Sequence, residues 1–161
     1  MRRSLVALAA LICCPAISLA ETPRPAAFFG ILLINTTLAP TSDAERTRMA
    51  ELEDRLVAGL EASGRYQMID TAPVANKMKL YANLSQCNGC DTDMAAELGA
   101  DVAVSGELQK TSNLILAMTI YVRDAATGEL VAGGSADMRG NTDESWFRTL
   151  DWILRNRIFE D

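Results

Sequence analysis

The chain has 161 residues and no histidine, and its 15 Lys and Arg against 21 Asp and Glu give a formal net charge of -6. An acidic surface repels phosphate backbones and anionic lipid headgroups, so nucleic-acid binding and a peripheral membrane role are both disfavoured. The absence of histidine removes the commonest general base, the commonest metal ligand and the usual partner of a nucleophilic Ser or Cys. The composition therefore favours a protein that is not an enzyme and needs no metal or cofactor.

Residues 1–20 have the pattern of a secretory signal peptide. A basic start at Arg2 and Arg3 precedes an apolar run, 5–17, that is too short for a membrane-spanning helix. Small residues near Ala20 predict cleavage after it; a buried N-terminal helix is the alternative. Cleavage would remove two of the 15 basic residues and move the net charge from -6 to about -8. The mature protein is therefore expected in the periplasm or outside the cell.

A lipid-anchored form would be acylated at Cys13 or Cys14, but neither cysteine follows the small residue that this chemistry prefers. Cleavage after Ala20 is therefore favoured. The proline-rich residues 21–27 are expected to form an extended leader, and residues 28–161 a single domain. No later segment is apolar for long enough to span a bilayer.

The hydrophobic pattern of the mature chain predicts strands that first alternate with helices and then follow one another. Apolar runs and two-residue alternation predict strands at 28–35, 65–70, 101–109, 113–123 and 129–138. Helical periodicity and caps predict helices at 42–63, 73–84, 94–98 and 141–158. The order β-α-β-α-α-β-β-β-α indicates an α/β (α+β) fold, a single mixed sheet of about five strands with helices on its faces.

Local signals fix some element ends. Ser42 and Glu45 have the spacing of a capping box, which predicts the start of the first long helix. Residues 141–144 are expected to cap the final helix in the same way, and Gly133 and Gly134 weaken the last strand, which suggests a bulge or a sheet edge.

Cys87 and Cys90 form a Cys-x-x-Cys motif around Asn-Gly. A haem site would need His directly after the second Cys, where Asp91 stands, and structural zinc would need four ligands. In an oxidising compartment the pair is expected to close a disulfide across a turn. Thiol redox chemistry and a metal site that borrows other ligands stay open as alternatives, although Asp91 and Asp93 oppose a stabilised thiolate.

Polar residues at the turns and at the end of the last helix form a candidate binding rim. Arg139 stands where a strand runs into a helix N-terminus, a place where backbone amides and a guanidinium could bind a carboxylate or phosphate. The alternative is an ordinary helix cap and a solvated turn. The predicted rim consists of Lys110, Ser112, Asn113, Arg139, Asn141, Asp143, Glu144, Arg155 and Arg157.

Trp152 is the candidate contact for a protein partner. At 100° per residue it points about 140° away from the Phe147 face of the final helix, so it is expected to be partly exposed. Packing beneath the leader segment is the alternative.

Two stretches resemble known envelope domains. The segment 95–109 (AAELGADVAVSGELQ), followed by the hairpin at 122–128 (VRDAATG), resembles domains of the curli-secretion-lipoprotein type and the N-terminal domain of the TolB type. In those domains a similar strand leads into a hairpin on a mixed sheet. The resemblance implies a fold, not an activity.

A closer resemblance is to a family of small secreted bacterial proteins known only as a domain of unknown function, of the 3280/2380 type. It rests on the segments 87–90 (CNGC), 109–116 (QKTSNLIL), 139–146 (RGNTDESW) and 155–157 (RNR). The resemblance implies a periplasmic or secreted protein and supplies no catalytic residue.

These observations favour a non-catalytic periplasmic or secreted accessory protein that contacts an envelope or secreted protein partner through a sheet edge or the final helix. A thiol-disulfide protein using Cys87 and Cys90 is one alternative, and a carrier of a small anionic ligand at Arg139 is another. The sequence leaves the partner, the oligomeric state and the biological process undetermined.

Overall fold

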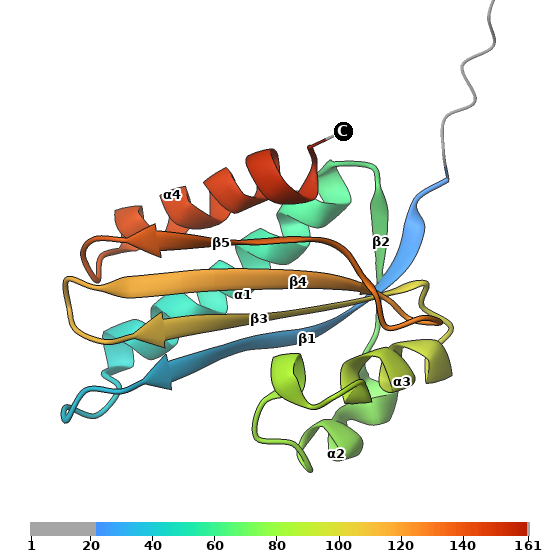
Figure 1. Ribbon diagram of the computed structural model, residues 1–161, viewed down its shortest axis with the longest axis horizontal. Coiled ribbons are helices and arrows are strands. Elements are labelled where there is room, and N and C mark those ends of the chain that lie inside the picture. The colour runs from blue at the N-terminus through green and yellow to red at the C-terminus, as the bar shows by residue number, and fades with distance from the viewer. Residues whose placement is uncertain (1–21, 161) are drawn as a thin grey trace, which may run out of the picture.

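The computed structural model describes residues 22–160, which fold around one five-stranded sheet (Figure 1). The predicted signal peptide, with Cys13 and Cys14, lies outside these residues. The strands are β1 (Arg24–Asn35), β2 (Tyr66–Ile69), β3 (Val102–Lys110), β4 (Leu116–Asp124) and β5 (Leu130–Met138). The helices are α1 (Asp43–Ala62), α2 (Ala75–Met78), α3 (Cys90–Glu97) and α4 (Asp143–Ile153), and a π-helical turn, Leu154–Ile158, extends α4.

The strands lie in the order β2-β1-β3-β4-β5, which makes the sheet mixed. β1 is parallel to β2 and β3, while β3, β4 and β5 form an antiparallel meander. The predicted fold class and element order are confirmed. The predicted edge is also present, because β5 ends the sheet and its register with β4 shifts between Val122 and Arg123.

β1 starts earlier than the sequence suggested. Residues 24–27, expected in the extended leader, pair with β2 from Arg24 to Ala27. Ala26 and Ala27 are fully buried. The proline and the alanines in this stretch hide its strand character, because neither residue type favours strands on its own.

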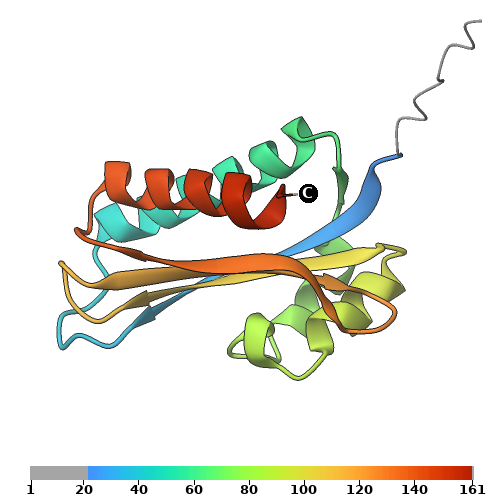
Figure 2. The same ribbon diagram turned by 45° about the horizontal axis from the view of Figure 1, so that its top comes forward.

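The two faces of the sheet are covered unequally (Figure 2). α1 and α4 lie along the whole of one face, and their apolar stripes meet the large core that includes Leu52, Leu56, Trp146 and Leu150. On the other face, α2 and α3 cover only the end near β2 and enclose a smaller cluster around Phe29 and Met94.

Local chemistry explains the helix starts. The Ser42 side chain accepts a hydrogen bond from the Glu45 amide while the Glu45 carboxylate accepts one from the Ser42 amide, which is the predicted capping box. α2 is much shorter than the predicted helix at 73–84, since it ends at Met78 and Asn83 caps a separate turn by accepting from the Ser85 amide. No helix within residues 22–160 has the length and apolarity needed to cross a membrane.

Candidate functional site

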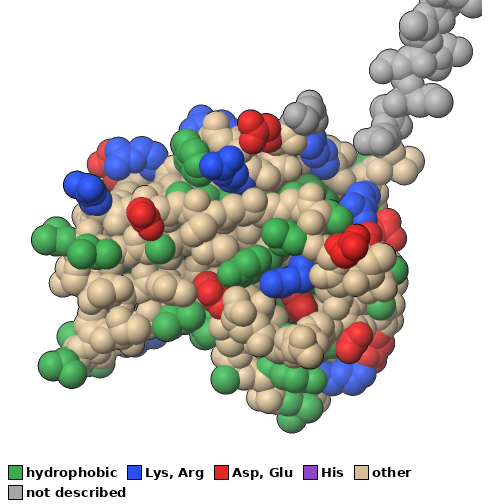
Figure 3. All heavy atoms as spheres, in the orientation of Figure 1, with side chains coloured by type: hydrophobic (Ala, Val, Ile, Leu, Met, Phe, Trp, Pro, Cys, Tyr) green, Lys and Arg blue, Asp and Glu red, His purple; other side chains and the backbone are tan. Residues whose placement is uncertain are grey.

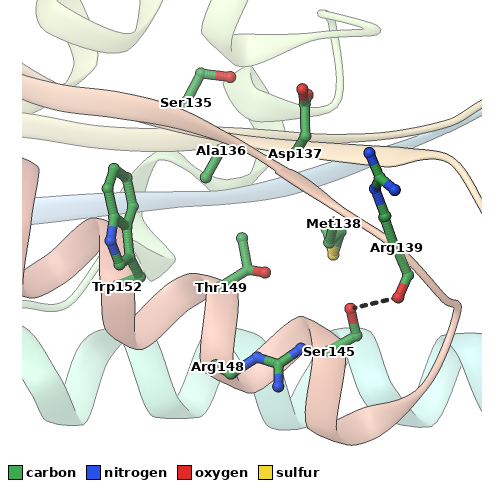
Figure 4. Close-up of a pocket in the computed structure, with 9 residues that line it drawn as sticks. All are labelled: Ser135, Ala136, Asp137, Met138, Arg139, Ser145, Arg148, Thr149 and Trp152. Atoms are coloured by element: carbon green, nitrogen blue, oxygen red, sulfur yellow. Dashed lines mark hydrogen bonds between the residues drawn. The ribbon is translucent and has the colours of Figure 1, made fainter.

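A groove runs between the free edge of β5 and the exposed side of α4 (Figure 4). α4 begins beside the end of β5 because the Thr142 hydroxyl caps it, accepting from the Ser145 amide at 3.3 Å. The groove encloses about 620 Å³. Its lining residues come from these two elements and the link between them: Ser135, Ala136, Asp137, Met138, Arg139, Ser145, Arg148, Thr149 and Trp152.

The strand side of the groove is a sheet edge without a neighbouring strand among the described residues. Such an edge presents backbone N–H and C=O groups that can pair with another extended segment. A glycine permits the close approach of the helical segment above it. A Cβ atom at Gly134 would lie 2.4 Å from the Cγ of Arg157, so only glycine fits there.

Trp152 stands at one end of the groove and Arg139 at the other (Figure 4). Trp152 is 39% exposed, as the helical spacing predicted, and the guanidinium of Arg157 lies 5.2 Å from the centre of its ring. The floor between them is formed by Ala136, Met138 and Thr149. The structure therefore places the two separately predicted contact residues, Arg139 and Trp152, in one groove.

Most charged side chains that line the groove have no ion-pair partner within the described part of the protein. In the part of the chain that the structure describes, neither the Arg139 guanidinium nor the Asp137 carboxylate has a hydrogen-bond or ion-pair partner, although the Arg139 carbonyl accepts from the Ser145 hydroxyl at 3.5 Å. Arg148 has only an exposed contact with Glu144 at 3.4 Å. The groove thus carries two weakly engaged arginines on a molecule whose net charge is negative.

The predicted polar rim divides into separate groups. Asn113, Asn141 and Asp143 lie together at one end of the sheet, where the Asn141 amide N–H donates to the Asn113 carbonyl. Arg48, which the sequence did not single out, donates to both Asn141 and Asp143. Arg155 and Arg157 lie at the other end of α4, so they do not join this group.

The sequence suggested that Lys110 lies in the turn between two strands, but this prediction is wrong. Lys110 is the last residue of β3, only 4% exposed, and its ammonium donates to the Glu45 carboxylate, which is 3% exposed. The alternation of β3 explains this position, because Leu108 and Lys110 point to the same core face. Lys110 therefore holds the end of β3 against α1 through its ion pair with Glu45, and its charge is not available at the surface.

Glu45 is surrounded by donors. Burial alone raises the pKa of its carboxyl, but hydrogen bonds from Lys110, Ser42 and Asn141 outweigh that effect and lower the pKa from 4.5 to about 2. The carboxylate is thus held ionised and ties together the start of α1, the end of β3 and the loop before α4.

The other rim residues have local roles. The Ser112 hydroxyl accepts from the amides of Leu114 and Ile115, which closes the turn between β3 and β4. Glu144 lies in the first turn of α4, exposed, and faces Arg148.

Cys87 and Cys90 are joined by a disulfide that spans the turn into α3. Asn88 and Gly89 both have positive φ, which explains why Asn-Gly suits this loop. Asp91, which stands where a haem-binding motif would have His, is buried and receives a hydrogen bond from Arg123 at 2.8 Å.

Sequence reasoning missed the cluster around Arg123. Its guanidinium also donates to the Ser85 carbonyl at 3.0 Å, so it fixes the segment that leads into the Cys-x-x-Cys turn against the sheet. The signal that could have revealed it is the charged residue that ends the apolar alternation of the 113–123 stretch. No group of three or more His, Cys, Asp or Glu within residues 22–160 is arranged to hold a metal ion.

The chain belongs to a protein family whose function is unknown. Residues 24–158 match the family model described as "Protein of unknown function (DUF2380)". The predicted family membership is thereby confirmed. No curated protein sequence matches the chain.

Solved structures with a similar fold come from bacteria. The LpoB C-terminal domain from Salmonella enterica has a TM-score of 0.51 at 10% identity, over 76% of this chain and 87% of that one. Lipoprotein GNA1162 from Neisseria meningitidis has a TM-score of 0.52 at 14% identity, over 74% of this chain and 85% of that one. TolB from Acinetobacter baumannii has a TM-score of 0.47 at 12% identity, over 77% of this chain and 25% of that one. The similarity to the first two is one of fold.

Proposed function

We propose that this protein is a non-catalytic accessory protein of the bacterial envelope that binds a protein partner in the groove between β5 and α4. The observation that carries the proposal is the placement of Arg139 and Trp152 at the two ends of a groove along an unpaired strand edge. A free edge binds an extended segment through backbone hydrogen bonds, and a half-exposed Trp is a typical anchor for a partner.

Charge indicates the chemistry of that segment. The Arg139 guanidinium has no partner within residues 22–160, and that of Arg148 has only an exposed one. The carboxylates of an acidic extended segment would therefore form ion pairs with both arginines. Among the described residues that line the groove, Asp137 is the only carboxylate. Asp137 would favour a bound segment that places one hydrogen-bond donor opposite its carboxylate.

An envelope location is supported by two observations. The N-terminal pattern predicts export, and the fold is shared with lipoprotein GNA1162 from Neisseria meningitidis. Export would also favour the disulfide at Cys87 and Cys90, because disulfides persist in oxidising compartments.

Site-specific photo-crosslinking tests the groove. A benzoylphenylalanine residue in place of Trp152 is expected to give an adduct with one periplasmic protein in living cells, and mass spectrometry would locate the bound segment. Tyr81, an exposed aromatic residue outside the groove, is the matched control position. Equal adducts from positions 152 and 81 would refute the proposed site.

Charge reversal then tests the orientation. The R139E variant is expected to weaken binding of a synthetic peptide of the crosslinked segment by about tenfold or more, the range of a charge-assisted hydrogen bond. The K79E variant, which reverses an exposed cation beyond α2, is expected to leave it unchanged. An unaffected R139E variant would remove Arg139 from the site.

A small anionic ligand at Arg139 is a second candidate function, favoured by the unpaired guanidinium. A thermal-shift screen with phosphate and dicarboxylates tests it. A rise in melting temperature that is absent in R139E would support a carrier, and no shift with any anion would exclude those anions as ligands.

A further inference from the structure

One end of the molecule carries two loops without any charged residue. The loop 36–42 follows β1 and the turn 111–115 joins β3 to β4, and their sequences are TTLAPTS and TSNLI. Both lie at the end of the sheet away from α2 and α3 (Figure 1). In a chain with 22% charged residues, an end of this kind is unusual in composition.

Three apolar side chains project from these loops. Leu38 is 106% exposed, Leu114 is 72% exposed and Ile115 is 63% exposed. Leu114 also lines a pocket with Ala39 and Pro40, which places the two loops next to each other. Figure 3 shows hydrophobic side chains standing out at this end of the molecule. Leu38, Leu114 and Ile115 are called the apolar tip below.

The backbone around the apolar tip is already hydrogen-bonded. The Thr36 amide donates to the Lys110 carbonyl at 3.0 Å, and the amides of Thr111 and Ser112 both donate to the Ile115 carbonyl. The Ala39 carbonyl accepts from the Asn35 side chain at 2.9 Å. A segment that enters an apolar medium must satisfy its own backbone groups, and these bonds satisfy part of them without a partner.

A cation without a protein partner lies beside the apolar tip. Leu116, the first residue of β4, pairs with Met138, the last residue of β5, so Ile115 and Arg139 lie just beyond these two strand ends, at the same end of the sheet. The guanidinium of Arg139 has no hydrogen-bond or ion-pair partner in residues 22–160. An apolar projection flanked by a free guanidinium matches a bilayer surface, where acyl chains lie beneath lipid phosphates.

We propose that the apolar tip inserts into the surface of a zwitterionic phospholipid bilayer, with Arg139 at the phosphate level. Side chains that project from convex loops fit a deformable acyl layer, and the site is separate from Trp152, which lies at the other end of the groove. The net charge of -6 excludes a strongly anionic surface as the favoured partner, because the rest of the molecule is repelled by it.

Depth-dependent quenching is the primary test, because it reports on the tip whatever else holds the full chain to vesicles. A Trp introduced by L114W is expected to be quenched by brominated acyl chains in vesicles of equimolar phosphatidylcholine and phosphatidylethanolamine. The matched control is L80W, since Leu80 is 78% exposed but follows α2, far from the apolar tip. An L114W signal that is quenched no more than that of L80W overturns the proposal.

Vesicle partitioning is the second test. Removing one apolar side chain from the inserted set is expected to lower the partition coefficient about tenfold, so L114D and I115D should each dissociate more readily than L80D. Replacing part of the lipid with phosphatidylglycerol is expected to give no gain in binding. L114D partitioning equal to that of L80D, or a large gain with phosphatidylglycerol, would contradict the proposal.

The proposal shares Arg139 with the partner-binding groove but does not involve Trp152. The W152A variant is expected to keep full quenching of L114W, whereas L114D is expected to keep the crosslink at position 152. Loss of quenching in W152A would mean that the groove, not the apolar tip, faces the vesicle.

Discussion

The buried ion pair of Glu45 and Lys110 supports the sharpest stability prediction. In the E45Q variant Lys110, a residue only 4% exposed, keeps its position but its ammonium loses its counterion. Leaving one member of a buried pair uncompensated costs about 3–5 kcal/mol. Asn141 would still donate to the new amide oxygen, so the loss should come mainly from the charge.

The pH dependence of stability tests the same buried ion pair in a second way. The pKa of Glu45 is about 2 in the folded protein, below its ordinary value of 4.5. The stability that it contributes is therefore fully present above pH 4.5 and is lost as the pH falls through about 2. A pKa difference of this size corresponds to about 3 kcal/mol.

Urea unfolding at neutral pH and across the acid range measures both effects. The wild type is expected to lose stability over that acid window, and E45Q should lack about 3 kcal/mol of the decline. The double variant E45Q/K110M removes both charges and is expected to recover part of the loss. If the free energy of unfolding of E45Q at neutral pH lies within about 1 kcal/mol of the wild-type value, this reasoning is refuted.

Three further predictions concern other polar contacts. R123M is expected to destabilise the fold by about 3 kcal/mol in urea unfolding, because Asp91 stays buried without its partner. Burial raises the pKa of Glu53, although the hydrogen bond from the Ile31 amide partly lowers it. The ionised carboxylate therefore destabilises the fold above the ordinary carboxyl pKa, and E53Q is expected to match or exceed the wild type in stability there. A large loss of stability in E53Q would contradict this. C87S is expected to cost about 2 kcal/mol and to leave insulin reduction at the background rate; a wild-type activity that C87S abolishes would instead support the thiol-disulfide alternative.

Much of the fold could be predicted from the sequence because local and global signals agree. The capping box at Ser42 and Glu45, the two-residue alternation of the last three strands and the apolar stripe of the final helix all specify the elements that form. The start of β1 was missed because tertiary pairing with β2 overrides the weak strand preference of Pro25 and its neighbouring alanines.

The candidate site was predictable only in part. Trp152 could be placed by helical geometry, and Arg139 by its position before a helix, since both depend on neighbours in sequence. That they share a groove depends on β5 lying at the sheet edge beside α4, which is a tertiary fact. The burial of Lys110 was missed for a related reason, because its counterion Glu45 is 65 residues away in the chain.

The buried polar cluster and the apolar tip are physically connected. The Glu45 carboxylate accepts hydrogen bonds from Lys110 at the end of β3 and from Asn141 in the loop before α4. The Lys110 carbonyl in turn accepts a hydrogen bond from the Thr36 amide in the loop after β1. A buried ion pair adds little net stability compared with an apolar pair of similar size, so its value here lies in holding three loops in one arrangement. E45Q/K110M should then retain much of the stability while its tip amides exchange faster with solvent. Unchanged exchange at 111–115 would show that backbone bonds alone hold the tip in place.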